Sequence, residues 1–218
     1  AVGCIPQRED ARDALIARDG LTLGNLPKGA VIGTSSLRRG CQMKFMRPDL
    51  VVESLRGNIN TRLNKLDEGR FDAILLACAG LRRMGWEHRI TERVSPDVCL
   101  PAVGQGALAL ECREDDGELL QFLSLLHHEP TALAVTAERA FLSALNGNCQ
   151  VPIGAHAVLK AGGHSGRRTI SLTGMVGSAD GIVLLRETRE GDDPVRLGRE
   201  LGESLLAEGA DRILAEAT

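Results

Sequence analysis

The chain has 218 residues, of which 43% are hydrophobic and 25% are charged, and its formal net charge at pH 7 is −3. This length leaves room for one large or two ordinary domains with filled cores. It holds no run of eighteen apolar residues and no charged-then-apolar leader, so we expect neither a membrane span nor a signal peptide. The small net charge and the scarcity of aromatic residues, with one Trp, four Phe and no Tyr, argue against a nucleic-acid partner.

Six cysteines stand far apart, without a Cys-x-x-Cys pair or an adjacent histidine pattern. This spacing argues against a disulfide scaffold and a zinc site, and it predicts a reduced, cytoplasmic protein with no metal. His127 and His128 are neighbours in sequence, and adjacent residues on a helix do not share a face, so we interpret them as structural.

The first half of the chain alternates short apolar runs with helical patterns. We expect strands at 1–5, 30–33, 51–55 and 73–77, and helices at 41–46 and about 60–66. This alternation is typical of a parallel sheet with helices on its faces. Hydroxyl groups at 34–36 follow one strand and precede a helix, an arrangement that favours an anion at the helix N-terminus.

Positive charge is concentrated between Lys28 and Arg93, where 13 Lys or Arg stand against 7 Asp or Glu. A localised basic region on a mildly acidic protein indicates a bounded anionic ligand. Several arginines follow strand ends, where parallel sheets bind their ligands, so we expect them to converge on one rim. They are Arg38, Arg39, Arg56, Arg62 and Arg83.

The second half of the chain predicts a hinge and then a small α+β unit. The hinge is the Pro-, Gly- and Ala-rich run 101–106. The expected strands are 107–111, 155–159, 169–176 and 182–187, the last two forming an antiparallel hairpin, and the expected helices are 115–126, 133–145, one from Asp193 to Gly209, and a short one closing the chain.

Cys149 lies on a short loop between the helix expected at 133–145 and an extended segment set by Val151-Pro152. Gly147 is expected to end that helix. The partial negative charge of a helix C-terminus opposes thiolate formation, so this position disfavours a Cys149 that is permanently ionised as a nucleophile. A sulfur that reacts once and stays bonded as a thioether remains compatible with this position.

Seven ordered motifs, at family spacing, resemble those of porphobilinogen deaminases, also called hydroxymethylbilane synthases. They are Arg8-Glu9-Asp10, Gly33-Thr34-Ser35-Ser36-Leu37-Arg38-Arg39, Ser54-Leu55-Arg56-Gly57-Asn58, Thr61-Arg62-Leu63, Ala79-Gly80-Leu81, Pro101-Ala102-Val103-Gly104-Gln105-Gly106-Ala107, and the Cys149 loop. One departure is Gly147-Asn148 before the cysteine, where the family usually has Gly-Gly. Because Asn tolerates positive backbone angles, we expect the loop to survive.

The resemblance implies an α/β fold with periplasmic-binding-protein-like, doubly wound domains and a mixed sheet, plus a small C-terminal α+β domain with an antiparallel sheet. On this basis residues 1–6 and 102–128 are expected to be a remnant of the first domain. Residues 7–101 would form the second domain, with anion-binding strand ends, and residues 129–218 the C-terminal domain with the cofactor cysteine.

The resemblance also implies a transferase of tetrapyrrole (haem) biosynthesis. In that family four porphobilinogen molecules are condensed, with loss of ammonia, onto a dipyrromethane cofactor, and hydroxymethylbilane is released. The cofactor would be bound covalently, as a thioether, to Cys149. Arginine suits its carboxylates because the planar fork bonds a carboxylate at two points. The residues expected to hold cofactor and substrate are Thr34, Ser36, Arg38, Arg39, Arg56, Arg62, Arg83 and Gln105.

The catalytic Asp of the family lies in a motif before the first residue of this chain, so the resemblance assigns it to no residue here. Glu9 and Asp10 are the nearest acids, and we expect them to be salt-bridged structural residues. We therefore expect little or no turnover from this chain alone, unless the missing N-terminal segment is supplied as a separate chain. The expected partner is the small-molecule substrate porphobilinogen, with no nucleic acid and no membrane, and the whole protein is expected to be a monomer.

Two other functions stay open. A two-lobed module that binds a carboxylate or phosphate without catalysis would use the same strand ends and would not need Cys149. A cysteine hydrolase is disfavoured because no histidine has a clear approach to the thiol. His156 lies seven residues further on, along an extended strand that carries it away.

Overall fold

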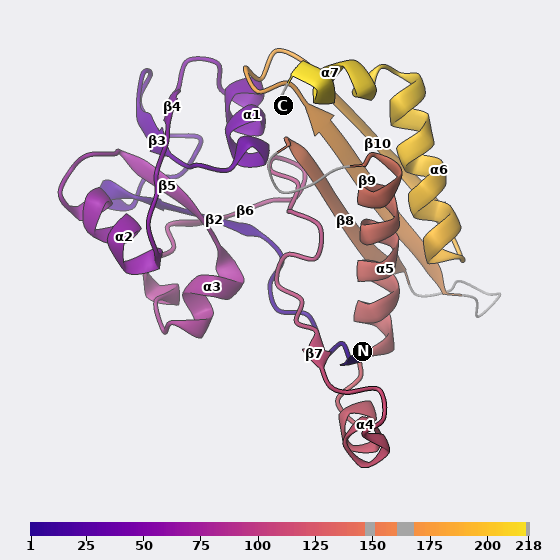
Figure 1. The fold of residues 1–218 in the computed structure, drawn as a ribbon. Helices are drawn as coiled ribbons and strands as arrows, with labels where there is room; N and C mark the ends of the chain where they lie inside the picture. The colour runs from indigo at the N-terminus through magenta and orange to yellow at the C-terminus, as the bar shows by residue number, and fades with distance from the viewer. Residues whose placement is uncertain (147–150, 161–167, 217–218) are drawn as a thin grey trace.

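The computed structural model describes residues 1–146, 151–160 and 168–216. In Figure 1 these form one unit built on a five-stranded sheet, a second unit built on a three-stranded sheet, and a narrow stalk that carries α4 next to the N-terminus. The division into 1–6 with 102–128, 7–101 and 129–218 stays a prediction.

The five-stranded sheet is mixed, with the order β4-β3-β5-β2-β6. Strand β3 runs parallel to β4 and β5, whereas β2 runs antiparallel to β5 and β6. The sheet that the resemblance implied is therefore confirmed, and the wholly parallel sheet suggested by the alternation is wrong. The strands are β2 Asp13–Ala17, β3 Val31–Gly33, β4 Val51–Glu53, β5 Ala73–Ala77 and β6 Glu92–Val94.

Strand β2 has no counterpart among the sequence predictions, although all five of its residues are buried. It is short, it begins with an acidic residue, and arginines stand on both sides of it at Arg12 and Arg18. Those charges hide the apolar run from a pattern search. Its burial on both faces follows from its place between β5 and β6, inside the sheet.

Helices cover both faces of this sheet (Figure 1). They are α1 Leu37–Met46, α2 Ile59–Asp67 and α3 Cys78–Arg83, with single 3-10 turns η1 Arg18–Gly20 and η2 Glu87–Arg89. Helix α1 begins four residues earlier than predicted, because the Ser36 side chain accepts a hydrogen bond from the Arg39 amide and caps it. Arg38 and Arg39 therefore lie in the first turn of a helix.

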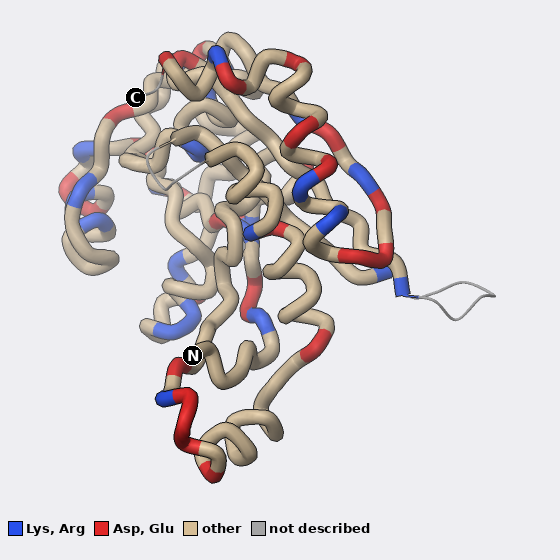
Figure 2. Tube along the Cα trace, turned by 45° about the vertical axis from the view of Figure 1, so that its right-hand side comes forward, with Lys and Arg blue, Asp and Glu red and all other residues tan. Residues whose placement is uncertain are grey.

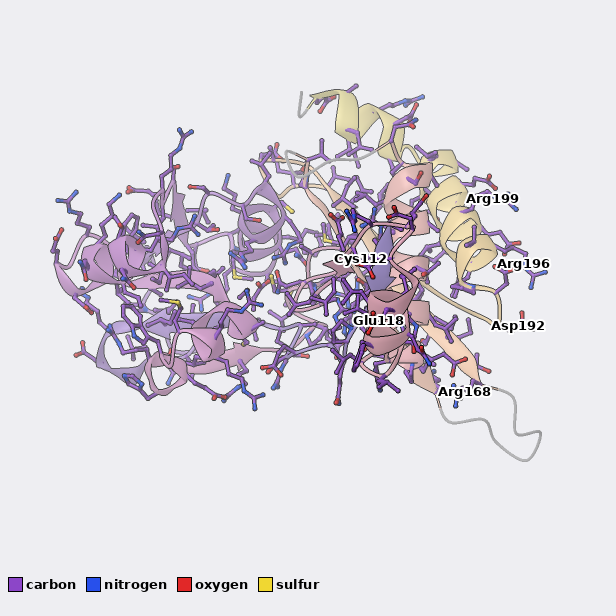
Figure 3. The ribbon with its side chains drawn as sticks, turned by 60° about the horizontal axis from the view of Figure 1, so that its bottom comes forward. Cys112, Glu118, Arg168, Asp192, Arg196 and Arg199 are labelled. Atoms are coloured by element: carbon purple, nitrogen blue, oxygen red, sulfur yellow. The ribbon has the colours of Figure 1, made fainter. Side chains whose placement is uncertain are left out.

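The second unit is an antiparallel sheet of order β10-β9-β8, with α5 and α6 packed together against it. Its elements are α5 Glu129–Ala144, β8 Ile153–Lys160, β9 Thr169–Gly177, β10 Leu184–Gly191, α6 Pro194–Ala207 and α7 Ala210–Glu216. The predicted β9–β10 hairpin is confirmed by its register. Leu197, Leu201 and Leu205 of α6 are buried as predicted, while Arg196 and Arg199 point away from the sheet (Figure 3).

The strand and the helix of the stalk are shorter than the sequence predicted. Strands β1 Val2–Cys4 and β7 Leu110–Glu111 pair antiparallel, and α4 Gly117–Ser124 follows. The strand predicted at 107–111 covers only Leu110 and Glu111, the two residues that pair with β1, and it follows a turn in which Gly104 and Gly106 adopt φ of 70° and 82°. The acidic residues of 111–118 gather at the end of the stalk (Figure 2).

Helix α1 joins the two units. Cys41 packs with Leu100 and with Met175 of β9, and Lys44 donates to the carbonyl of Ala179 at 3.1 Å. At Gly181 (φ 78°) an added Cβ would lie 2.5 Å from Lys44 Cβ, so the β9–β10 turn fits closely against the helix. The arginine-bearing helix is thus held by both sheets.

Within the described ranges, no helix combines the length and the apolar character needed to cross a membrane.

Candidate functional site

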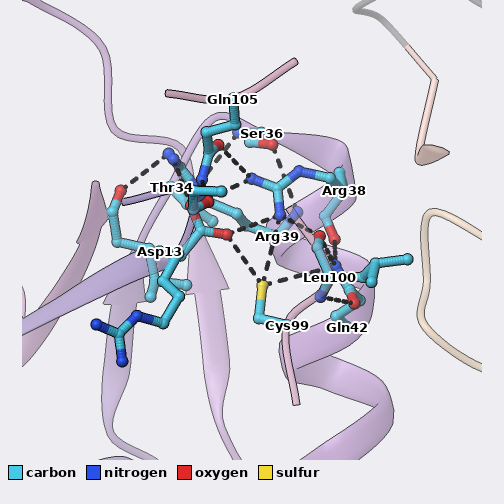
Figure 4. Close-up of polar contacts among 12 residues, drawn as sticks. Asp13, Thr34, Ser36, Arg38, Arg39, Gln42, Cys99, Leu100 and Gln105 are labelled. Carbon is cyan, nitrogen blue, oxygen red and sulfur yellow. Dashed lines mark hydrogen bonds and ion pairs between the residues drawn. The ribbon is translucent and has the colours of Figure 1, made fainter. Parts of the chain in front are cut away.

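Two arginines in the first turn of α1 share one buried carboxylate (Figure 4). Asp13, the first residue of β2, is fully buried; its Oδ2 lies 2.7 Å from Arg38 Nη1 and its Oδ1 lies 2.7 Å from Arg39 Nη2. Burial raises the pKa of Asp13, but the charges of Arg38 and Arg39 outweigh it and hold that pKa well below its ordinary value. The three groups together carry one net positive charge.

Further protein groups complete this cluster. Gln105 donates from Nε2 to Asp13 Oδ1 at 3.0 Å and accepts from Arg38 Nη2 at 3.3 Å. The Cys99 thiol donates to Asp13 Oδ2 at 3.3 Å; burial, followed by the charge of Asp13, raises its pKa, so it stays protonated. Both carboxylate oxygens of Asp13 are therefore fully engaged.

A cavity of about 260 Å³ opens beside the cluster. The residues that line it are Ser36, Arg38, Arg39, Ala102, Val103, Gln105, Leu142, Val151 and Ile153. The polar part of the lining thus presents two guanidinium groups, a hydroxyl and an amide. The apolar part comes from the hinge, from α5 and from the segment that leads into β8. Cys149 lies outside the described residues, two positions before Val151.

Five of the eight predicted binding residues meet here. Ser36, Arg38, Arg39 and Gln105 line the cavity, and Thr34 is buried behind them, where its hydroxyl accepts from the Ser36 amide at 3.2 Å. Thr34 therefore shapes the turn into α1.

The remaining three arginines lie outside the cavity. Arg62 is the nearest of them: burial, and then the positive charge of Arg39, lower the pKa of its guanidinium, and its Nε donates to the Gly57 carbonyl at 2.8 Å. Arg56 and Arg83 are exposed, and across the part of the chain that the structure describes the side chain of Arg83 makes no hydrogen bond or ion pair. The roles predicted for all these residues stay predictions.

Sequence reasoning missed Asp13, which organises the cluster. The available signal was an acidic residue opening the apolar run Asp13–Ala17, since a charge in a buried strand needs partners. The apolar wall formed by Leu142, Val151 and Ile153 was also missed. Nothing in their spacing indicates that they face two arginines more than a hundred residues away in sequence.

A buried ion pair between Arg8 and Glu138 also bonds the main chain of the hinge segment 101–106 and holds it against the second unit. Arg8 Nη1 lies 2.6 Å from Glu138 Oε1, and Glu138 also accepts from the amides of Gly104 and Ala157 at 2.7 and 2.8 Å. Arg8 Nε donates to the Gln105 carbonyl at 2.8 Å. The main-chain carbonyl of Gln105 therefore contacts the ion pair, and its side chain contacts the Asp13 cluster, so this residue links the two.

Glu9 and Asp10, the acids nearest in sequence to the family motif that precedes this chain, are salt-bridged, as expected. Asp10 lies 2.7 Å from Arg12, and Glu9 lies 3.2 Å from Arg82. His127 accepts from the Ile5 amide, and His128 accepts from the Thr131 amide to cap α5, which gives both a structural role. Among the described residues, no three His, Cys, Asp or Glu side chains are grouped so that they could hold a metal ion.

A larger cavity, of about 810 Å³, lies between the stalk and α5. Its lining is largely apolar, with Val2, Leu108 and Val135, and Arg139 brings the one positive charge among its lining residues. The smaller cavity presents two cations to a ligand, and one of its lining residues, Val151, follows Cys149 by two positions. It is therefore the better candidate for a site that binds an anionic ligand.

Comparisons with known proteins agree on one family. A family model described as "Porphobilinogen deaminase, dipyromethane cofactor binding domain" matches residues 1–121, and one described as "Porphobilinogen deaminase, C-terminal domain" matches residues 132–207. The porphobilinogen deaminase of Brevibacillus brevis is 54% identical over 99% of this chain and 68% of its own length. That of Paenibacillus macerans is 55% identical over 95% and 68%, and that of Bacillus pumilus 52% identical over 98% and 67%.

The chain thus spans about two thirds of the length of these relatives. A solved structure of a Salmonella typhimurium periplasmic binding protein aligns with 58% of this chain and 57% of its own, at 18% identity. Its TM-score of 0.35 is too low to support a common fold.

Proposed function

This chain belongs to the porphobilinogen deaminase family, transferases of tetrapyrrole biosynthesis, and we propose that the cavity beside Arg38 and Arg39 holds the carboxylates of the family's dipyrromethane cofactor. The observation that carries this proposal is the pair of buried guanidinium groups that line the cavity together with Val151.

The residues present fit such a group. A dipyrromethane carries acetate and propionate side chains on flat, largely apolar rings. The cluster offers one net positive charge to a carboxylate, and Arg62 adds a second cation close to Arg39. The apolar wall of Leu142, Val151 and Ile153 suits the ring faces.

Hydrogen-bond donors remain for a ligand. Arg38 uses Nη1 and Nη2 on Asp13, Leu100 and Gln105, and within the described residues its Nε donates to no acceptor. The Ser36 hydroxyl accepts from the Arg39 amide, so its proton is available to a carboxylate oxygen. Charge-assisted bonds from arginine to carboxylate are roughly twice as strong as neutral ones.

We assign the attachment to Cys149 through a thioether. Support comes from the sequence of the loop and from the position of Val151 in the cavity wall. When bound, the cofactor supplies the primer to which porphobilinogen units are added with loss of ammonia. The part of this chain is to bind and orient carboxylates, with Arg56, Arg62 and Arg83 proposed to take those of the growing product.

We further propose that porphobilinogen is the small-molecule substrate and that hydroxymethylbilane is released. We also propose a cytoplasmic location and a monomeric protein. The expectation that this chain alone turns over little substrate also stays a prediction, which a steady-state assay of hydroxymethylbilane formation addresses.

Calorimetric titration with porphobilinogen tests the site when all chains compared carry Cys149→Ala, so that no covalently bound cofactor occupies the cavity. We expect Arg39→Gln to weaken binding about tenfold or more, because a hydrogen bond to a charged group contributes about 1.5–3 kcal/mol. The matched control is Arg47→Gln, which also removes an arginine paired with an aspartate but lies at the opposite, C-terminal end of α1 and outside the cavity. Equal affinities of Arg39→Gln and the wild type would remove the basis of the proposal.

A further inference from the structure

Asp13 has no role in the binding set predicted from the sequence, yet every polar side chain of the cavity wall except Ser36 touches it. Its carboxylate receives Arg38, Arg39 and Gln105, and it does not itself line the cavity. It therefore stands one layer behind the groups that face a ligand.

We propose that Asp13 is a positioning residue, which fixes the guanidinium groups of Arg38 and Arg39 so that their remaining N–H groups face the cavity. The inference rests on the proposed function, because it concerns the carboxylate ligand of the same cavity.

The geometry of the bonds supports positioning. A guanidinium is planar, so fixing one edge of the group fixes the direction of the other N–H bonds. Asp13 bonds the Nη1 and Nη2 edge of Arg38 at 2.7 and 3.3 Å, and the Nε and Nη2 edge of Arg39 at 2.9 and 2.7 Å. One carboxylate thus sets the orientation of both cations.

The charges explain why a carboxylate is needed there. The side chains of Arg38 and Arg39 are 5% and 10% exposed, so two unpaired cations at this place would repel each other with little screening by water. Asp13 neutralises one of them. The single charge that remains favours one further carboxylate from a ligand.

The surroundings of Asp13 hold its carboxylate in place. It is the first residue of β2, which lies inside the sheet between β5 and β6, and the Asp13 side chain is fully buried. Gln105 and the Cys99 thiol occupy the remaining lone pairs of its carboxylate. A site whose supporting groups are themselves fixed loses little entropy when it binds.

The test separates the position of the carboxylate from its charge and from stability. Asp13→Glu keeps the charge and moves the carboxylate by one methylene, and Asp13→Asn keeps the shape and removes the charge. Gln105→Met keeps Asp13 and both arginines but removes the hydrogen bonds that the Gln105 amide makes to Asp13 and Arg38. This variant replaces the Asp13 variants in the test if either of them does not fold. Leu201→Ala, in the core of the second unit, is the control for lost stability.

Affinity for porphobilinogen is measured by calorimetry on the 218-residue chain, together with urea denaturation of each variant. Every chain, including the one called wild type at the other positions, carries Cys149→Ala, so that no covalently bound cofactor occupies the cavity. We expect Asp13→Glu and Asp13→Asn to weaken binding about tenfold or more, Gln105→Met several-fold, and Leu201→Ala less than twofold although it also lowers stability. Wild-type affinity in Asp13→Glu, or an equal loss in Leu201→Ala, would overturn the positioning role while the proposed function stands. Absence of saturable binding by the wild type would overturn both.

Discussion

Arg8, in the segment between β1 and β2, forms a two-point ion pair with Glu138 of α5, with Nη1 to Oε1 at 2.6 Å and Nη2 to Oε2 at 3.1 Å. Their side chains are 11% and 0% exposed. Glu138 also receives two main-chain amides, one from the hinge and one from β8. The connection between the two units is therefore built on a charged group that water cannot reach.

Removing Arg8 should be costly. We expect Arg8→Ala to lower the free energy of unfolding by about 3–5 kcal/mol, because it leaves the Glu138 carboxylate buried without its counter-charge. Urea denaturation measures this loss. Arg18→Ala is the matched control: its ion pair with Asp72 is largely exposed, so the expected loss is about 1 kcal/mol or less. Similar losses in the two variants would contradict a buried ion pair at Arg8.

The cluster around Asp13 should make stability depend on pH in acid. The folded-state pKa of Asp13 is held below its ordinary value of 3.8, so its contribution is fully present above that value and is lost as the pH falls below it. The difference in unfolding free energy between wild type and Asp13→Asn should therefore be largest near pH 6 and shrink below about pH 4. A difference that grows on acidification would contradict the assigned charge state.

Two glycines in helices should respond to alanine in opposite directions. At Gly198 of α6 an added Cβ would lie 2.3 Å from the Ala137 carbonyl oxygen, so Gly198→Ala should force α5 and α6 apart and destabilise the protein by about 1–3 kcal/mol. Gly117, at the start of α4, has no atom within 4 Å of such a Cβ. Gly117→Ala should stabilise by up to about 1 kcal/mol. Thermal denaturation of both variants checks the contrast, and the same sign in both would show that the packing is described wrongly.

Ser36 combines a cap with a place in the cavity wall. Ser36→Ala should cost about 1 kcal/mol of stability and also weaken porphobilinogen binding. Asp193→Ala removes the cap of α6, far from the cavity, and should cost a similar amount of stability at unchanged affinity. Parallel calorimetry and denaturation separate the two effects. Unchanged affinity in Ser36→Ala would exclude its hydroxyl from ligand binding.

Much of the fold could be predicted from the sequence, because local signals marked it. Apolar runs on either side of the turn at 179–181 indicated the hairpin of β9 and β10. The spacing of Leu197, Leu201 and Leu205 indicated α6, and hydroxyl residues after β3 indicated an anion site. Strand β2 was missed because burial inside a sheet removes the alternation that marks a strand, and flanking arginines disguised the run.

The candidate site was predicted in part for a similar reason. Arg38, Arg39, Ser36 and Gln105 belong to recognisable motifs, and the cavity brings them together. Arg38 and Arg39 are buried and paired because they contact Asp13, which also bonds Gln105 of the hinge. Arg56 and Arg83 have no such partner among the described residues and are exposed. These contacts join residues some 25 to 92 positions apart, which no local pattern reveals.

The central claim is that this chain holds a dipyrromethane on Cys149 beside Arg38 and Arg39, and the mass of the intact chain tests it most directly. The protein is produced in cells that make porphobilinogen and is weighed under denaturing conditions, which keep a thioether and remove any ligand bound without a covalent bond. We predict an excess mass equal to two condensed pyrrole units in the wild type and none in Cys149→Ala. A wild-type chain at its bare mass, or an excess that persists in Cys149→Ala, would contradict the account.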